Sequence, residues 1–358
     1  MTPTRRINVQ EVPTIRSYDD ADDAVATTLL WASVFDSPAG GQTIEWLFRD
    51  GPGGDAPRMV AECDGQVVAH AGCVPIRFVV EGADVLAGYS VAAMTHPAAR
   101  GRGLYVRLGE ALYQEMERRG FAFVAGFSNR NSLRLSTGAL GRRPVQPFPW
   151  CVKLLRPIRA LRSGLCAPRQ EGPSARAFPP TKLGNIVVEE GVIGSPELDS
   201  LWPRVRATVL VGAVRDASYN RWRFGGHPDA GYRLLLAREG ATLRGYCVFR
   251  LLRYKGVNAA FLMDMLLEPD ANHVGAALLM ALGGWAKSGD AALMSALLPG
   301  SGPVREALGT AGYHSIPALF HPHRIVFSVR GLGRFSNSVS SLSNPHAWFL
   351  TWADTDIV

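Results

Sequence analysis

An internal repeat is the feature that most constrains the fold of this chain, because the same landmarks return 171 to 176 residues later. An apolar hairpin pattern around Asp64-Gly65 is matched by another around Glu239-Gly240. Two apolar runs joined by such a turn predict a β-hairpin. Three single residues recur at nearly the same spacing: Trp46 with Trp222, Gly101 with Gly275, and Gly141 with Gly312. A repeat of this length within 358 residues predicts two copies of one domain fold.

Both copies predict the same order of elements: a hairpin, a long strand, a helix, a strand and a short helix. The helix of the first copy carries one apolar stripe, at Leu104, Leu108, Ala111, Leu112 and Met116. The expected long strand, helix and following strand are 84–95, 104–118 and 121–127 in the first copy, and 259–267, 275–287 and 291–298 in the second. Strands that alternate with helices predict an α/β (α+β) fold in which each copy has a mixed central sheet flanked by helices.

A basic, proline-rich segment separates the two copies. Residues 151–184 contain seven basic residues, one acidic residue and five prolines, in a chain whose net charge is +7. Such a composition is typical of a linker. The expected domains are therefore 1–150, a linker over 151–184, and 185–358. Because no nucleic-acid motif accompanies the basic residues, we expect no specific nucleic-acid partner.

Several classes of protein are excluded by simple patterns. No apolar run approaches the roughly 18 residues that span a bilayer, and the N-terminus lacks the apolar stretch of a secretory signal. A cytoplasmic protein without a membrane span is therefore expected. Its five cysteines form no Cys-x-x-Cys pair, so we expect neither a metal site nor a disulfide framework. The sequence leaves the oligomeric state open, with a homodimer among the options.

The segment 94–105 carries the strongest chemical signal. A strand is followed by the loop Arg100-Gly101-Arg102-Gly103, and an amphipathic helix begins at once. The first N–H groups of a helix have no internal acceptor, and glycines let the backbone approach a ligand closely. Such a loop favours a phosphate group, although a glycine turn can also serve chain geometry alone. It is not a dinucleotide fingerprint, because Val106 stands where the third glycine would be.

This loop, preceded by His96-Pro97, resembles the signature loop of the GNAT N-acetyltransferase superfamily. Residues 128–133 and the later Leu140-Gly141 resemble the second motif of that superfamily. The resemblance implies two tandem GNAT-like domains and acetyl-CoA as co-substrate. It also implies transfer of an acetyl group to the primary amine of a small-molecule acceptor.

Individual residues acquire expected roles from the resemblance. The backbone of Met94 and Thr95 would bind the pantetheine arm, and the backbone of Gly101 to Leu104 would hold the pyrophosphate. Arg100 and Arg102 would add positive charge to that loop. Asn129 or Asn131 would contact the arm where two parallel strands separate.

The catalytic acid is less clearly indicated. Many relatives carry a tyrosine seven residues after the motif asparagine, but Ser136 stands there in this sequence. Tyr89 and His96, near the same strand, are the other candidate catalytic residues. His96 can also serve only to shape the turn before proline. His70 lies in an apolar strand and is interpreted as a core histidine.

The second copy is expected not to bind coenzyme A. Its corresponding segment, 268–277, keeps Gly275 but lacks both arginines and the second glycine. Glu268 and Asp270 would repel a pyrophosphate.

Two later segments bear on the acceptor. The pattern from Arg215 to Phe224, and the tail from Trp348 to Asp356, resemble segments of enzymes that N-acetylate nucleotide-linked amino sugars. The alternative is that Trp222 and Trp348 are packing residues and that the tail caps the second domain. Three functions therefore stay open: acetylation of an amino sugar, acylation of another small amine, or a GNAT-fold binding protein without turnover. The basic linker alone favours tRNA-dependent aminoacyl transfer, a fourth option.

Overall fold

The computed structural model describes residues 12–35, 40–145, 148–157, 177–228, 231–254, 256–317, 326–336 and 340–355. Most of the expected basic linker therefore lies outside the described residues. The chain divides into two compact units. Unit 1 comprises residues 1–78, 84–145 and 325–343, and unit 2 comprises 79–83, 146–324 and 344–358.

The sheet of unit 1 has the order β1-β2-β3-β4-β5-β16-β6. Strand β4 pairs with β5 in parallel, whereas the β1–β2, β2–β3, β5–β16 and β16–β6 pairs are antiparallel. The strands are β1 (Thr14–Ser17), β2 (Arg58–Cys63), β3 (Gln66–Val80), β4 (Ala83–Thr95), β5 (Phe123–Ser128), β6 (Arg143–Pro144) and β16 (Val326–Gly331). The helices are α1 (Asp20–Phe35), α2 (Gly40–Phe48), α3 (Leu104–Arg118) and α4 (Arg130–Arg134), which continues as the π-helical turn η2 (Leu135–Ala139).

The apolar stripe of α3 forms the core of unit 1 as its spacing predicts. Leu104, Leu108, Leu112 and Met116 are buried together with Val124 of β5 and residues of β2 and β3. Burying one such side chain contributes roughly 1.5–3 kcal/mol. This packing fixes the start of α3 close to the end of β4.

The sheet of unit 2 has the order β15-β7-β14-β13-β12-β11-β9-β8. Its β13–β14 pair is parallel, and the other pairs along this order are antiparallel. The strands of this sheet are β7 (Trp150–Leu154), β8 (Thr181–Leu183), β9 (Ile186–Gly191), β11 (Arg233–Glu239), β12 (Thr242–Tyr254), β13 (Val257–Leu267), β14 (Leu293–Leu297) and β15 (His314–Ser315). The short strands β10 (Val211–Ala213) and β17 (Trp348–Phe349) lie outside this sheet and pair with each other. The helical segments are α6 (Leu198–Val205), α7 (Ala217–Asn220), η5 (Arg221–Gly225), α8 (Asn272–Ser288), α9 (Pro303–Thr310) and the short η10 (Trp352–Asp354).

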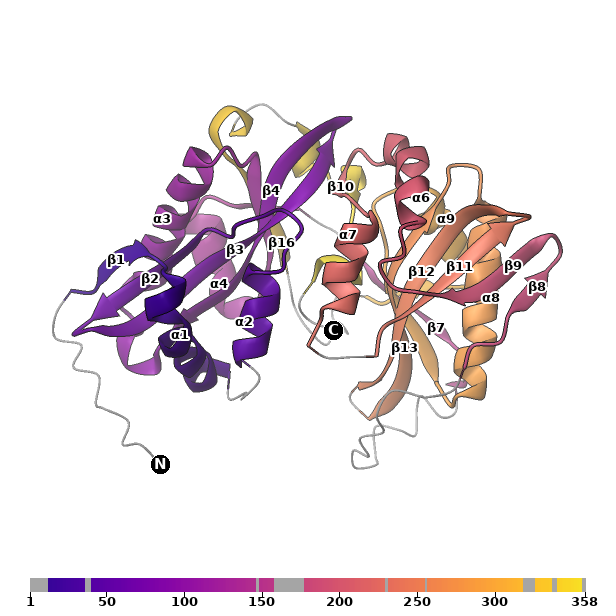
Figure 1. Ribbon diagram of the computed structural model, residues 1–358, viewed down its shortest axis with the longest axis horizontal. Helices are drawn as coiled ribbons and strands as arrows, with labels where there is room; N and C mark the ends of the chain where they lie inside the picture. Colours follow the sequence, from indigo (N-terminus) through magenta and orange to yellow (C-terminus); the bar gives the residue numbers. More distant parts are fainter. Residues whose placement is uncertain are drawn as a thin grey trace. The chain divides into compact units, whose positions relative to one another are not determined.

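Each sheet contains one strand from the other part of the sequence. Strand β7 follows β6 directly along the chain but pairs with β14. Strand β16 comes late in the sequence but pairs with β5 and β6, and it lies among the strands of the first half in Figure 1. The units therefore do not follow the expected ranges 1–150 and 185–358, because residues 325–343 belong to unit 1.

The expected α/β fold class with mixed central sheets is confirmed. Both strand orders contain a parallel pair, β4–β5 or β13–β14, at the same point in the order of elements. This similarity is consistent with two tandem GNAT-like domains. The expected hairpins, long strands and helices are all present, with bounds that differ by a few residues.

Candidate functional site

The loop between β4 and α3 is shaped by His96 and two glycines. His96 precedes a short 3₁₀ turn, η1 (Pro97–Ala99), and its Nδ1 accepts the N–H of Ala98 at 3.2 Å. That bond assigns a turn-shaping role to His96. Partial burial, and then the nearby Arg100, lower the pKa of His96, so the imidazole is neutral near pH 7.

Gly101 and Gly103 both adopt left-handed backbone conformations, with φ of +79° and +71°. Gly103 is the N-cap of α3, and its carbonyl accepts the N–H groups of Val106 and Arg107. A Cβ atom added to either glycine would meet no atom within 4 Å. Within the described residues, the N–H groups of these two glycines donate to no acceptor. The loop thus presents open backbone donors at a helix N-terminus, where the helix dipole also favours an anion.

Both arginines of the loop are exposed. Arg100 donates from Nε to the carbonyl of Thr95 at 3.3 Å, which ties the loop to the last residue of β4. Met94 is buried and Thr95 is half-buried. The structure therefore brings together Met94, Thr95 and the whole run Arg100 to Leu104, as the sequence predicts.

Strands β4 and β5 separate beside this loop. Their parallel pairing covers only Gly88 with Val124 and Tyr89 with Ala125, although both strands continue for several residues. Ala92 of β4 has φ of +50°, which interrupts the regular strand just beyond the pairing. A gap between two parallel strands leaves backbone groups of both edges available to a ligand.

His70 of β3 holds this irregular part of β4. Its Nδ1 lies 2.9 Å from the carbonyl oxygen of Ala92, and because a carbonyl only accepts, Nδ1 carries the proton. Burial lowers the pKa of His70 to about 4, so the ring is neutral at ordinary pH. The interpretation of His70 as a core residue agrees with its full burial. Its Nε2 has no hydrogen-bond partner among the described residues.

The remaining candidates are held in structural contacts. Ser136 is fully buried, and its Oγ donates to the Leu133 carbonyl at 3.0 Å and lies 2.9 Å from Ser128 Oγ. Tyr89 is buried with its ring 5.6 Å from that of Phe78. Both side chains are therefore buried among their neighbours.

The two motif asparagines lie at the start of α4. Asn129 precedes the helix, and its Oδ1 accepts the N–H of Ser132 at 3.1 Å, which is a helix-capping role. The side chain of Asn131 is outside the described part of the chain. Sequence reasoning missed Arg142 and Ser328, which lie near the β4–β5 gap; the only signal was an arginine directly after the Leu140-Gly141 turn.

The corresponding segment of unit 2 is built differently. Helix α8 begins at Asn272, so Gly275 lies inside the helix and not in a loop. A Cβ atom at Gly275 would lie 2.6 Å from Leu267 and 2.7 Å from Ala307, so the glycine serves close packing. The expected helix over 275–287 is therefore present and begins three residues earlier. Glu268 accepts hydrogen bonds from Arg204 and Arg244, so its charge is neutralised within the protein.

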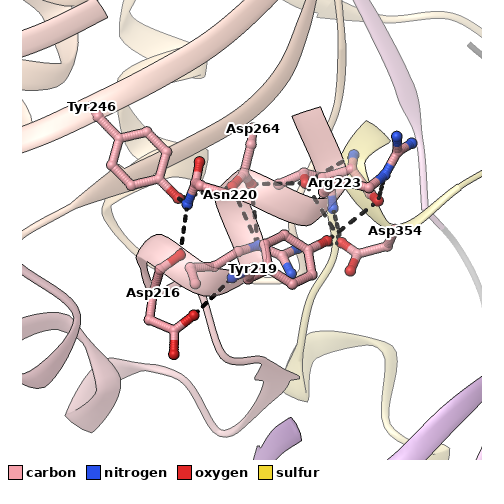
Figure 2. A network of polar contacts seen from close by, with 10 residues as sticks. Asp216, Tyr219, Asn220, Arg223, Tyr246, Asp264 and Asp354 are labelled. Atoms are coloured by element: carbon pink, nitrogen blue, oxygen red, sulfur yellow. Dashed lines mark hydrogen bonds and ion pairs between the residues drawn. The ribbon is translucent and has the colours of Figure 1, made fainter. Parts of the chain in front are cut away.

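The two segments that resembled acceptor-specific patterns meet in one buried network. Arg215 is completely buried, and its Nη2 lies 2.6 Å from Asp354 Oδ2 while its Nε lies 3.3 Å from Asp264 Oδ2. Arg223 donates to the carbonyls of Ala353 and Thr355, both at 2.7 Å. Figure 2 shows Arg223 of η5 beside Asp354 of the C-terminal tail. The immediate role of these contacts is to bind the tail to the core of unit 2.

The tail also occupies the region where β13 leaves β14. Their parallel pairing ends at Phe261 with Ser295. Beyond this point Asp264 accepts hydrogen bonds from Thr351 Oγ1 and Tyr246 Oη, both at 2.9 Å. Trp352 packs against the ring of Trp150 at 5.2 Å. The gap in unit 2 is therefore filled by the chain itself, which agrees with the interpretation of the tail as a cap.

Two features are absent from the described residues. No helix among them is long and apolar enough to cross a membrane. No group of three or more His, Cys, Asp or Glu side chains in those residues is arranged to bind a metal ion.

Comparison with known proteins gives a domain match in the first copy. Residues 14–133 match the family model described as an acetyltransferase (GNAT) domain. Comparison with curated proteins gives no match. The GNAT match covers β1 to the start of α4, including the glycine loop and the β4–β5 gap.

Solved structures resemble almost the whole chain. A probable N-acyltransferase from Enterococcus faecalis aligns over 90% of this chain and 73% of its own, with a TM-score of 0.60 and 10% identity. A GCN5-related N-acetyltransferase from Anabaena variabilis aligns over 89% and 72%, with a TM-score of 0.60 and 10% identity. N-myristoyltransferase of Saccharomyces cerevisiae, with bound myristoyl-CoA, aligns over 91% and 80%, with a TM-score of 0.57 and 12% identity. At these identities the likeness shows the fold, and with the domain match it supports an acyl-CoA-dependent N-acyltransferase.

Proposed function

We propose that this protein transfers an acyl group from an acyl-CoA to a primary amine, and that unit 1 binds the donor. One observation carries the proposal: β4 and β5 separate directly beside a glycine loop whose N–H groups are open. The GNAT domain match over this segment supports it. So does a structural neighbour that binds myristoyl-CoA.

The loop would hold the pyrophosphate of coenzyme A. The N–H groups of Gly101 and Gly103 donate to phosphate oxygens, and the exposed Arg100 and Arg102 add positive charge. The pantetheine arm then lies along the backbone of Met94 and Thr95 at the end of β4. This arrangement directs the thioester into the gap between β4 and β5.

The reaction in this gap is a direct acyl transfer. The neutral amine attacks the thioester carbonyl carbon, a C–N bond forms, and the C–S bond breaks to release the thiolate of coenzyme A. The amine loses one proton to a base, and the thiolate gains one. Orientation and backbone donors near the carbonyl oxygen supply most of the acceleration. We assign no protein group to this base, because His96 lies beyond the end of β4 on the loop side of Thr95, and its Nδ1 already accepts the N–H of Ala98.

The acceptor is proposed to be a small molecule with a primary amine, and nucleotide-linked amino sugars are the first compounds to screen. The resemblance of Arg215–Phe224 and of the tail to amino-sugar enzymes supports that choice. Those residues bind the tail within unit 2, so they do not themselves define an amine pocket. Other small amines belong in the same screen.

Calorimetric titration with acetyl-CoA, the simplest acyl donor, tests the proposal. We expect one binding site per chain. Release of free thiol in the presence of an amine then measures turnover. A protein that binds neither coenzyme A nor acetyl-CoA would contradict the proposal and favour a binding protein without turnover.

A further inference from the structure

Arg142 is a buried arginine in unit 1 that has no carboxylate partner among the described residues. Its exposed fraction is 4%, and its Nε donates to Tyr113 Oη at 2.6 Å. Its terminal nitrogens, Nη1 and Nη2, make no hydrogen bond or ion pair with any described residue. Buried cations are normally paired with an anion, because removing a charge from water is costly. Arg142 is therefore poised to bind an anion that the described chain does not supply.

The guanidinium reaches the point where β4 and β5 separate. Gly126 and Ser90 are the first residues beyond the last parallel pair, Tyr89 with Ala125. A Cβ atom at Gly126 would lie 3.0 Å from Arg142 Nη1 and 3.0 Å from the carbonyl oxygen of Ser90. The absence of a side chain at Gly126 thus leaves room for the guanidinium at the inner end of the gap.

The surroundings of Arg142 are polar. Ser328 of β16 is paired with Gly126 in register, so the two residues point to the same face of the sheet. Ser328 is completely buried, and its Oγ has no hydrogen-bond partner in the described part of the chain. Ser128 lies two residues beyond Gly126 and therefore faces the same way. Ser128 Oγ is already bonded to Ser136 Oγ, but a long apolar chain would leave Ser328 Oγ and the Arg142 terminal nitrogens unpaired, which is unfavourable.

A small cavity, about the size of one water molecule, lies between this region and the start of α3. Its volume is about 10 Å³, and it lies between β4 and α3. Thr95 and Tyr105 line it near the loop, and Ser90 and Tyr113 line it near Arg142. In the proposed binding mode, an acyl group at the inner end of the gap would meet the guanidinium.

We propose that Arg142 binds a carboxylate at the end of the acyl chain, so that the preferred donor is a short dicarboxylic acyl-CoA, such as malonyl- or succinyl-CoA. This inference rests on the proposed function, because it assumes that coenzyme A binds along β4. The planar guanidinium can contact both oxygens of a carboxylate. The two terminal nitrogens have no partner among the described residues but are not fully enclosed, so a ligand can reach them. The unpaired Ser328 Oγ is a further donor on the same face.

A purely structural role explains only part of the arrangement. The bond from Nε to Tyr113 would hold the side chain against α3. It does not supply an acceptor for the two terminal nitrogens, of which Nη1 lies beside Gly126 at the gap. A carboxylate on the acyl chain accounts for both features.

Calorimetry with four ligands tests the inference without knowledge of the acceptor. Free CoA, acetyl-CoA, malonyl-CoA and succinyl-CoA are titrated into the wild-type protein, Arg142→Gln and Arg143→Gln. Arg143 is exposed and adjacent, so its substitution is a control that changes the same charge outside the pocket. We expect the wild type to bind one of the carboxylated donors about tenfold to a hundredfold more tightly than acetyl-CoA. Arg142→Gln abolishes this preference while it keeps affinity for free CoA, and Arg143→Gln keeps the preference.

Each alternative outcome is decisive. Equal affinity for all three acyl donors, or a preference that survives in Arg142→Gln, would overturn the role of Arg142 but leave the proposed function standing. Absence of binding for every ligand, including free CoA, would overturn the proposed function itself. If Arg142→Gln does not fold, Arg142→Lys keeps the charge, and the comparison of donors in the wild type alone decides whether a carboxylate is preferred.

Discussion

Replacing Gly103 by alanine should separate the cost of backbone strain from the loss of ligand binding. Gly103 has φ of +71°, a conformation that costs an L-residue roughly 1–2 kcal/mol. Gly120, at the other end of α3, has φ of +79°. A Cβ atom at either position meets no atom within 4 Å, so neither substitution creates a clash in the free protein. Both variants should therefore lose similar stability.

Only the Gly103 methyl group would project toward the proposed pyrophosphate. We expect loss of about one charge-assisted hydrogen bond, roughly 1.5–3 kcal/mol, which corresponds to about a 10- to 100-fold weaker affinity for coenzyme A. Gly120→Ala should bind as the wild type does. Gly275→Ala, in α8, would bring a Cβ atom within 2.6 Å of Leu267 and should cost roughly 1–3 kcal/mol of stability without any effect on affinity.

Calorimetry with free CoA measures the affinities, and urea unfolding measures the stabilities. Wild-type affinity in Gly103→Ala would refute the assignment of this loop to the pyrophosphate. A similar loss of affinity in Gly120→Ala would mean that strain in α3, not contact with the ligand, is responsible. A loss in Gly275→Ala would show that unit 2 takes part in binding coenzyme A.

Two further predictions concern stability. Burial lowers the pKa of His70 to about 4 from 6.5 in the unfolded chain, so its contribution to stability is fully present above pH 6.5 and is lost as the pH falls to about 4. The free energy of unfolding measured in urea should fall by about 3 kcal/mol across this window in the wild type. The same pH dependence in His70→Gln would contradict the assignment of this loss to His70. Asp354→Ala leaves Arg215 buried without its closest carboxylate and should destabilise unit 2 by about 3–5 kcal/mol. Glu45→Ala, which breaks an exposed ion pair with Arg49, should cost less than about 1 kcal/mol, and thermal unfolding of the two variants compares the losses.

The parts of the fold that local patterns determine were predictable. Helix α3 and strand β4 agree with the sequence because their apolar spacing and their glycine boundaries are encoded in consecutive residues. The loop residues Arg100 to Leu104 were found for the same reason. Its role in binding stays a prediction until it is measured.

The parts that depend on distant pairing were not predictable. Strand β16 joins β5 across almost two hundred residues of chain, as its partner Ser128 for Val326 shows, and no local pattern specifies such a partner. Ser328 enters the surroundings of the β4–β5 gap only through that pairing. The match of Gly101 with Gly275 was misleading, because the two glycines have different roles. Gly101 lies in an open loop with a positive φ, whereas Gly275 lies inside α8 and allows close packing.

The C-terminal tail gives a physical reason why the two copies would differ in function. In unit 1 the gap between β4 and β5 contains an arginine without a counter-ion. In unit 2 the corresponding region contains Asp264, whose oxygens are already bonded to Thr351 and Tyr246, and the tail is held there by Arg215 and Arg223. A donor could enter unit 2 only by breaking several buried hydrogen bonds and an ion pair together. The free-energy cost would be about 8 kcal/mol, which is as large as the binding free energy of a typical micromolar ligand. The same fold is therefore open to a ligand in one copy and closed by its own chain in the other.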